Sequence, residues 1–326
     1  MGSQVPSRCG PSRWGPRALG PTRPGGEAGA MSSPAADPDR TASPVVAAVD
    51  GSAASMGAVH AAAGSAQRLG VPLRLVRVVP QPGDDPGDQR AAHVEFERAV
   101  QQLDEARRTV VALLPALPVN AVVRRGRAAH ELQTESVGAA QVVLGEHTGP
   151  GLGLVAGELA RRTASPLLLH RTVDRPTGPV VVGLDCLPGT ETLLEVAAEE
   201  AHRRGTALHV LHGRMSRTAS SLVLAAEQRL LERLADRARG DHHPLQVHVQ
   251  AVATNATTLL LTAAADAQVL VLGRRTPGAR RRTSSTGSSV LLRAACPVLL
   301  VPGPLRGEDG TLHPRAVAHQ RAGSSA

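Results

Sequence analysis

Two aspartates stand at the same point of two short apolar runs. Asp50 follows the run VVAAV at residues 45–49, and Asp185 follows PVVVGL at residues 179–184. Runs of this length and composition are typical of buried parallel strands, and open α/β sheets bind ligands outside the carboxyl ends of such strands. Each carboxylate is therefore a candidate hydrogen-bond acceptor for a ligand. The alternative is that each aspartate is the N-cap of the following helix, and because aspartate is a favoured cap we weigh the two roles equally.

A second candidate set consists of glycines that follow a later apolar run in each half. QVVL at residues 141–144 leads into Gly145, and QVLVL at residues 268–272 leads into Gly273. Glycines at strand ends let backbone N–H groups approach a phosphate. Arginines follow the second glycine, and they suit either phosphate binding or a solvated basic turn: Arg274, Arg275, Arg280, Arg281 and Arg282. The stretch TSSTGSS at residues 283–289 leaves a flexible linker or a phosphorylation target open.

Strand and helix patterns alternate around these residues. In the first half the helix predicted at residues 53–69 ends at Gly70, a residue type that commonly stops helices. Alternation of this kind predicts a parallel sheet with helices on both faces, a doubly wound α/β fold. The predicted strands of the first half are residues 45–50, 72–79, 119–124, 141–145 and 166–170.

The second half of the chain repeats the order of the first. The interval from Asp50 to Gly70 equals that from Asp185 to Gly205, and SPLLLH, starting at Ser165, matches CPVLLV, starting at Cys296. A duplication with a period of roughly 130 residues explains both matches. The sequence therefore predicts two tandem doubly wound domains, each with a five-stranded parallel sheet.

The predicted domains span residues 43–172 and 178–302. Residues 1–42 are crowded with Pro, Gly, Ser and Arg and lack a hydrophobic period, so we expect a disordered leader. Met31 is an alternative start of the chain. The composition of residues 303–326 predicts a disordered tail in the same way.

Composition narrows the function. The 36 basic residues are all arginine and give a net charge of +8, which invites phosphate or nucleic-acid partners. Trp14 and Phe96 are the only aromatic residues, so stacking platforms for bases are lacking and nucleic acid is disfavoured as the main partner. The sequence has no lysine, no Gly-x-Ser-x-Gly elbow and no paired catalytic carboxylates. We therefore predict that the protein is not an enzyme.

Cysteine and histidine patterns predict no disulfide and no metal site. Cys9, Cys186 and Cys296 are odd in number and widely spaced, and the thirteen histidines match no ligand spacing. We interpret His209 and His212 as surface histidines. Cys186 is either a redox-sensitive thiol or a small buried side chain. The sequence shows no apolar run of about 20 residues and no signal peptide, which predicts a cytoplasmic protein without membrane contact.

The segments VVAAVDGS, VVLG, VLVLG and CPVLLV resemble the signature segments of the universal stress protein family, in the tandem form common in actinobacteria. The resemblance covers nearly all of residues 44–302. It implies a five-stranded parallel sheet that in some members binds ATP at the strand carboxyl ends. It also implies an acidic residue after the first strand, where Asp50 and Asp185 match, and a motif G-x2-G-x9-G-[S/T]. A carboxylate there is suited to the adenine amino group or a ribose hydroxyl.

The first-half loop departs from this motif. Gly126 matches the family glycine after the third strand. Gly153 matches the final motif glycine, but Leu154 stands where Ser or Thr belongs and the loop is short. Its glycines are Gly145, Gly149, Gly151, Gly153 and Gly157. These departures argue against ATP binding in the first half.

The second-half loop keeps nearly the full length of the motif. Gly273, Gly278, Gly287 and Ser288 give G-x4-G-x8-GS, with Arg274 inside it. Thr254 takes the place of the family glycine, and the neighbouring Asn255 is expected to tolerate a left-handed turn.

The resemblance implies a stress-response regulatory protein that binds ATP or senses another ligand, mainly through its second domain. The alternatives are a degenerate scaffold that acts through protein contacts and an ATP-using transferase or hydrolase. We further expect the two domains to pack about a pseudo-two-fold axis through their final strands. Homodimerisation is left open.

Overall fold

The computed structural model describes most of both predicted domains. The described residues are 43–83, 85–146, 153–171, 175, 177–185, 190–215, 221–240, 244–274, 285–303, 305–306 and 312–313. The predicted leader lies outside them, as do Gly149, Gly151, Cys186 and Gly278. The arginines at 275 and 280–282 also lie outside.

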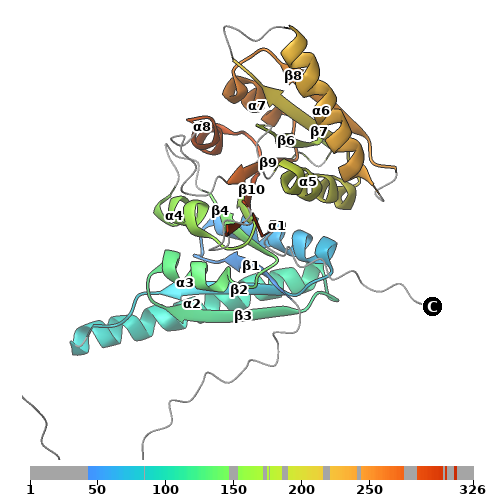
Figure 1. Cartoon of the computed structure of the whole chain (residues 1–326). Coiled ribbons are helices and arrows are strands. Elements are labelled where there is room, and N and C mark those ends of the chain that lie inside the picture. The colour runs from blue at the N-terminus through green and yellow to red at the C-terminus, as the bar shows by residue number, and fades with distance from the viewer. Residues whose placement is uncertain are drawn as a thin grey trace, which may run out of the picture. The chain divides into compact units, whose positions relative to one another are not determined.

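The first half alternates strands and helices as the sequence predicts (Figure 1). Its elements are β1 (Val45–Ala48), α1 (Ala53–Leu69), β2 (Leu73–Val79), α2 (Pro86–Leu113), β3 (Val119–Arg125), α3 (Ala128–Glu135), β4 (Gln141–Gly145), α4 (Leu154–Arg162) and β5 (Leu167–His170).

The second half repeats this order. Its elements are β6 (Val180–Gly183), α5 (Thr190–Arg204), β7 (Leu208–Gly213), α6 (Ser221–Arg239), β8 (Val247–Val252), α7 (Ala256–Ala264), β9 (Val269–Arg274), α8 (Ser285–Arg293) and β10 (Val298–Pro302). Two short strands follow within the range predicted as a tail, β11 (Leu305–Arg306) and β12 (Leu312–His313), and they pair antiparallel.

The strands of each half form a parallel sheet with the order of a doubly wound fold. The order is β3-β2-β1-β4-β5 in the first half and β10-β9-β6-β7-β8 in the second. The two sheets are continuous, because β10 pairs antiparallel with β5. The predicted fold class is confirmed, and the continuity of the sheet is a feature that the strand patterns do not reveal.

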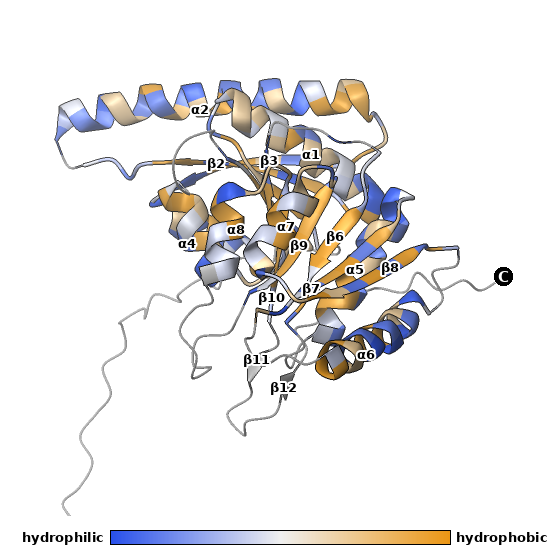
Figure 2. Ribbon diagram, turned by 90° about the horizontal axis from the view of Figure 1, so that it is seen from above, coloured by the Kyte–Doolittle hydropathy of each residue, from blue (hydrophilic) through white to orange (hydrophobic). Residues whose placement is uncertain are grey.

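Alternate strand residues face opposite layers of helices. Val45 and Ala47 of β1 belong to a buried cluster with residues of α1, α2, α5 and α6, whereas Val46 belongs to a second cluster with residues of α3, α4, α7 and α8. Figure 2 shows the central strands as strongly apolar and α2 and α6 as helices with one hydrophilic side. Burial of both sheet faces explains why the strands are nearly continuous Val and Leu runs.

The ends of α1 show how the local sequence fixes the helices. The side chain of Ser52 caps the amino end by accepting a hydrogen bond from the N–H of Ser55 at 3.1 Å. Gly70 ends the helix with a φ of 66°, and Gly205 ends α5 with a φ of 64°. Because L side chains disfavour this left-handed region, both positions favour glycine, as the repeat predicts.

Two histidines lie on adjacent strands of the second half. The rings of His209 in β7 and His248 in β8 meet edge to face, with centroids 5.1 Å apart and planes at 83°. Burial lowers the pKa of His209 below its ordinary value, and the charge of His248 lowers it further. His209 is only partly exposed, which corrects its interpretation as a surface residue.

We predict that acid weakens the second half through His209. Because the pKa of His209 is lowered in the folded state, its contribution to stability is present above the unfolded value, about 6.5, and is lost as the pH falls through the folded value. Replacing it by Gln should flatten the decline in the urea unfolding midpoint between about pH 7 and pH 5. The control is His60→Gln, at an exposed position of α1, which should keep the parent slope. An unchanged slope in His209→Gln contradicts the prediction.

Candidate functional site

Strand order places a switch point in each half. β1 pairs with β2 on one side and with β4 on the other, and β6 pairs in the same way with β7 and β9. Chain connections leave these central strands in opposite directions, so a crevice opens outside their carboxyl ends. We call the residues at these strand ends the first-half rim and the second-half rim.

Asp50 lies exposed at the first-half rim. Its Oδ1 accepts a hydrogen bond from the N–H of Ser52 at 2.8 Å, and its own N–H donates to Oγ of Ser55 at 3.3 Å. Since Ser52 is the N-cap of α1, the capping alternative for Asp50 is not followed. The aspartate instead closes the tight turn at Gly51, whose φ is 82°.

Asp185 lies exposed at the second-half rim. Helix α5 begins at Thr190, five residues beyond it, so Asp185 is not the cap of that helix. The preceding residue, Leu184, is held from both sides. Its N–H donates to the carbonyl of Leu211 at 3.0 Å, and its carbonyl lies 2.9 Å from Nδ1 of His212.

His212 lies near the carboxyl end of β7, beside the second-half rim. It was predicted to lie on the surface, and this prediction was wrong. It is 5% exposed, and its Nε2 lies 3.5 Å from Oε2 of Glu227 in α6. Oε1 of the same carboxylate lies 2.5 Å from Nη1 of Arg214. The burial of His212 could have been predicted, because it lies, like His209, in a strand that must be buried on both faces. The network braces the strand end that carries Asp185.

The glycines of the first-half rim serve close packing and a special backbone angle. A Cβ on Gly145 would overlap the carbonyl oxygen of Ala54 in the first turn of α1. Gly126 has a φ of 142°, and its N–H donates to the carbonyl of Val79 at 2.9 Å. Both positions therefore require glycine for the fold itself, whatever they bind.

In the second half, a side-chain N-cap stands beside the position that matches Gly126. Asn255 follows Thr254 and is the N-cap of α7, with a φ of −66°. Its Oδ1 accepts hydrogen bonds from the N–H groups of Thr257 at 2.8 Å and Thr258 at 3.4 Å. The expectation of a left-handed asparagine was therefore wrong. Its side chain satisfies donors at the amino end of α7, whereas Arg127 at the start of α3 makes no such bond.

The strand end at Gly273 is more open than the one at Gly145. A Cβ on Gly273 would meet the Cδ2 atom of Leu193 at 3.1 Å, the far end of a flexible side chain. Arg274 is the last residue of β9 and pairs in register with Pro302 of β10. Gly273 and Arg274 thus lie on the strand adjacent to β6, which leads to Asp185.

Gly287 and Ser288 lie inside the first turn of α8, not before it. Helix α8 starts at Ser285 and α4 starts at Leu154, and each start lies thirteen residues before the next strand. The position that matches Gly153 is therefore residue 284, which is outside the described residues. The third helical residue, Gly287, still carries one of the N–H groups without an intrahelical partner.

The residue after the strand-end glycine differs in charge between the halves. Glu146 follows Gly145, is 7% exposed, and has its Oε2 2.6 Å from Nη2 of Arg171. Burial raises the pKa of Glu146, and Arg171 acts in the opposite direction. The matching residue in the second half is Arg274. Arg274 was predicted as a ligand-binding residue and Glu146 was not, although the alignment of Gly145 with Gly273 makes the two residues equivalent.

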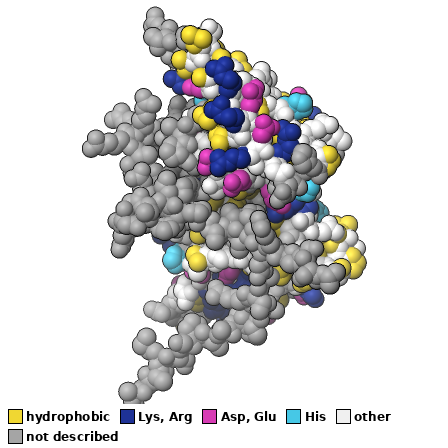
Figure 3. Space-filling view, turned by 45° about the vertical axis from the view of Figure 1, so that its right-hand side comes forward, with side chains coloured by type: hydrophobic (Ala, Val, Ile, Leu, Met, Phe, Trp, Pro, Cys, Tyr) yellow, Lys and Arg dark blue, Asp and Glu magenta, His cyan; other side chains and the backbone are white. Residues whose placement is uncertain are grey.

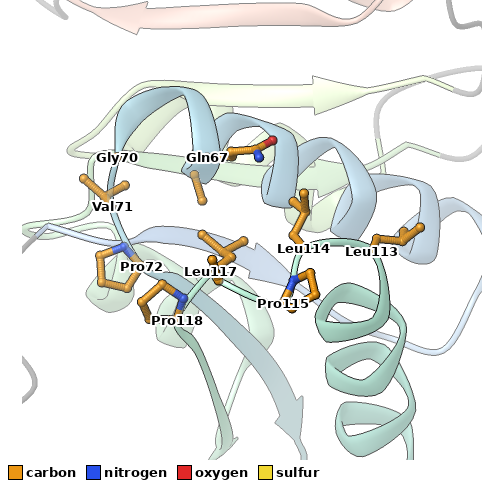
Figure 4. Close-up of a pocket in the computed structure, with 11 residues that line it drawn as sticks. Gln67, Gly70, Val71, Pro72, Leu113, Leu114, Pro115, Leu117 and Pro118 are labelled. Carbon is orange, nitrogen blue, oxygen red and sulfur yellow. The ribbon is translucent and has the colours of Figure 1, made fainter.

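An apolar groove among the described residues lies away from both rims. It has a volume of about 410 Å³, and its lining includes Pro72 and Pro118, which precede β2 and β3, and the apolar side chains of Leu114 and Leu117 (Figure 4). These residues lie at the amino ends of the strands, so the groove is not part of the candidate site.

Charges on the face drawn in Figure 3 are interleaved in sign and not gathered into one basic patch. Arg237 pairs with Glu191 at 3.5 Å and joins α6 to α5. Among the described residues, no group of three His, Cys, Asp or Glu side chains converges as a metal site would require. In the same part of the chain, no helix has the length and apolarity that crossing a membrane requires.

Fold and rims together define a tandem doubly wound α/β protein with a candidate ligand site at each switch point. The sequence model of the Universal stress protein family matches residues 42–171 and 177–302, so the chain belongs to this family.

Among its relatives is the universal stress protein Rv1996 of Mycobacterium tuberculosis, 31% identical over 198 residues, which are 52% of this chain and 62% of the relative. The chain thus spans less than two thirds of that relative's length. A universal stress protein from Archaeoglobus fulgidus shares the fold with a TM-score of 0.64 and 17% identity, over 79% of this chain and 97% of the other. A putative universal stress protein from Pseudomonas aeruginosa has a TM-score of 0.54 and 16% identity, over 82% and 95%.

We predict that the two strand-end glycines respond differently to alanine. Gly145→Ala forces a Cβ into the backbone of α1 and should destabilise the protein by about 2 to 3 kcal/mol. Gly273→Ala only displaces the end of Leu193 and should cost less than about 1 kcal/mol. Chemical denaturation of both variants measures the difference. Equal losses would show that the two strand ends are not packed differently.

Proposed function

We propose that this chain is a stress-response regulatory protein that binds adenine nucleotide, ATP in particular, mainly through its second half. The observation that carries the proposal is the charge of the residue after the strand-end glycine. At the second-half rim this residue is Arg274, whereas at the first-half rim it is Glu146, already paired with Arg171. A triphosphate is attracted to the guanidinium of Arg274 and is not attracted to the carboxylate of Glu146.

The proposed pose uses two neighbouring strand ends. The carboxylate of Asp185, after β6, accepts a hydrogen bond from the adenine amino group or a ribose hydroxyl. Arg274, at the end of the adjacent β9, and the free N–H groups in the first turn of α8 receive the phosphates. Gly287 leaves that turn without a bulky side chain, Ser288 remains a proposed contact in the same helix, and Gly278 remains one in the segment before it.

No reaction is assigned to the site. The rim supplies a carboxylate, a guanidinium and backbone donors, which suffice to hold a nucleotide. Occupancy would then act by favouring one conformation or one partner contact. A scaffold that has lost its ligand and acts through protein contacts is the alternative, and the acidic residue Glu146, paired with Arg171 at the first-half rim, supports it.

We also propose that the two halves are related by a pseudo-two-fold axis at β5 and β10. By position in their strands, Leu168 and Leu299 are equivalent residues, and in the antiparallel ladder they pair with each other. Pairing of equivalent residues is what a two-fold axis requires. The ladder would then do within one chain what a dimer contact does between single-domain relatives.

We predict that ATP binds the full chain saturably and that binding depends on the second-half rim. In calorimetric titrations, Asp185→Ala and Arg274→Ala should each weaken binding roughly tenfold or more, because each removes a charge-assisted hydrogen bond. Gly287→Leu should weaken it by obstructing the first turn of α8.

The matched control is Asp50→Ala at the first-half rim, which should leave the affinity within about twofold of the parent. If the parent shows no binding at millimolar ATP, the scaffold alternative replaces the proposal. If Asp50→Ala abolishes binding while Asp185→Ala does not, the ligand belongs to the first half.

A further inference from the structure

A buried ion pair lies at the first-half rim. Glu146 directly follows β4 and Arg171 directly follows β5, and these strands are parallel neighbours, so both residues leave the sheet at the same edge. Oε2 of Glu146 and Nη2 of Arg171 are 2.6 Å apart, with side chains 6% and 13% exposed. A pair this deeply buried is rarely retained for stability alone, because desolvation offsets much of its attraction.

The same guanidinium reaches into the second half. Its Nη1 donates to the carbonyl of Cys296 at 3.3 Å, and its Nη2 donates to the carbonyl of Leu291. Leu291 lies in the last turn of α8, where carbonyls lack intrahelical partners and a cation is favoured by the helix dipole. Arg171 therefore contacts both the end of α8 and the residues that lead into β10.

The arrangement exists on one side only. By strand position, the second-half residues that match Glu146 and Arg171 are Arg274 and Pro302, which cannot form an ion pair. Helix α8 leads into β10, which runs parallel to β9, so the first turn of α8 lies toward the edge of the sheet at which β9 ends. Its nine residues span about 13 Å, so a constraint at one end is transmitted rigidly to the other.

We propose that Arg171 is a positioning residue that ties the first-half rim, through Glu146, to helix α8 and thereby fixes the amino-terminal turn of α8 at the second-half rim. Its consequence for nucleotide affinity rests on the function proposed above. Its effect on α8 itself does not.

The main variant must remove both charges of the pair together. Replacing Arg171 alone would strand the carboxylate of Glu146, whose pKa burial already raises, and could destabilise the whole chain. The double variant Glu146→Gln/Arg171→Met removes both charges and keeps the side-chain volumes. Glu146→Gln alone keeps the bonds from Arg171 to the two carbonyls. Arg162→Met is the control, because Arg162 is 64% exposed and pairs with Glu158 of its own helix at 3.6 Å.

Hydrogen–deuterium exchange of the full chain without ligand reads out α8 directly. In the double variant, amides of residues 288–293 should exchange about tenfold faster than in the parent, while α5 and β7 of the same half stay unchanged. Glu146→Gln breaks only the ionic link between Arg171 and the first-half rim, so it should raise exchange in α8 by a smaller factor, about threefold. The proposal is overturned if α8 in the double variant matches Arg162→Met, or if exchange rises evenly over both halves.

A second arm titrates the same variants with ATP. The double variant should bind about three- to tenfold more weakly than the parent, and Glu146→Gln should bind with an affinity between the two. If the parent does not bind ATP, the nucleotide proposal fails while the exchange result still decides the role of Arg171. Weaker binding without faster exchange of α8 overturns the positioning role.

Discussion

The place of one central strand in each half is the constraint on which the rest of the structure depends. β1 lies between β2 and β4, and β6 lies between β7 and β9, so successive crossovers leave the central strand in opposite directions. This reversal puts the end of β1 beside the end of β4, and the end of β6 beside the end of β9. Residues separated by about a hundred positions in the sequence, such as Asp50 and Gly145, thereby share one rim.

The two rims share a backbone plan but have diverged in chemistry. In the first half, Gly145 packs against the backbone of α1, and the residue after it is an acid neutralised by Arg171. In the second half the corresponding glycine meets only a flexible side chain, and the residue after it is Arg274. Thr254 likewise stands in the place of Gly126, and the next residue, Asn255, caps α7 with its side chain. Selection on the fold therefore explains the glycines of the first half, and the proposed binding would account for the charge of Arg274 in the second.

Most of the fold could be predicted from the sequence, because it follows from local patterns that occur twice. Apolar runs, helix-stopping glycines and their equal spacing gave the elements, and the repeat gave the two sheets. Positions that depend on counting through a loop were less secure. Gly287 and Ser288 seemed to complete a phosphate loop, yet the start of α8 at Ser285 places them inside the helix. Contacts across the fold left no local signal at all, since Arg171 meets carbonyls about 120 residues away and His212 meets a carboxylate on another layer.

Joining two copies in one chain changes what each copy is free to become. In a dimer of identical chains, any change at one rim occurs at the other as well, so an ion pair like that of Glu146 and Arg171 would be present at both. A tandem chain removes this coupling, because each half can mutate alone. In this chain the ladder of β5 and β10 joins the two halves. Arg171, at the first-half rim, binds the carboxyl end of α8, and the other end of this rigid helix lies toward the second-half rim. The two halves of this chain thus differ at their rims, which the halves of a symmetric dimer cannot do. Arg171 connects these differences, because it pairs with Glu146 in the first half and donates to carbonyls of the second half.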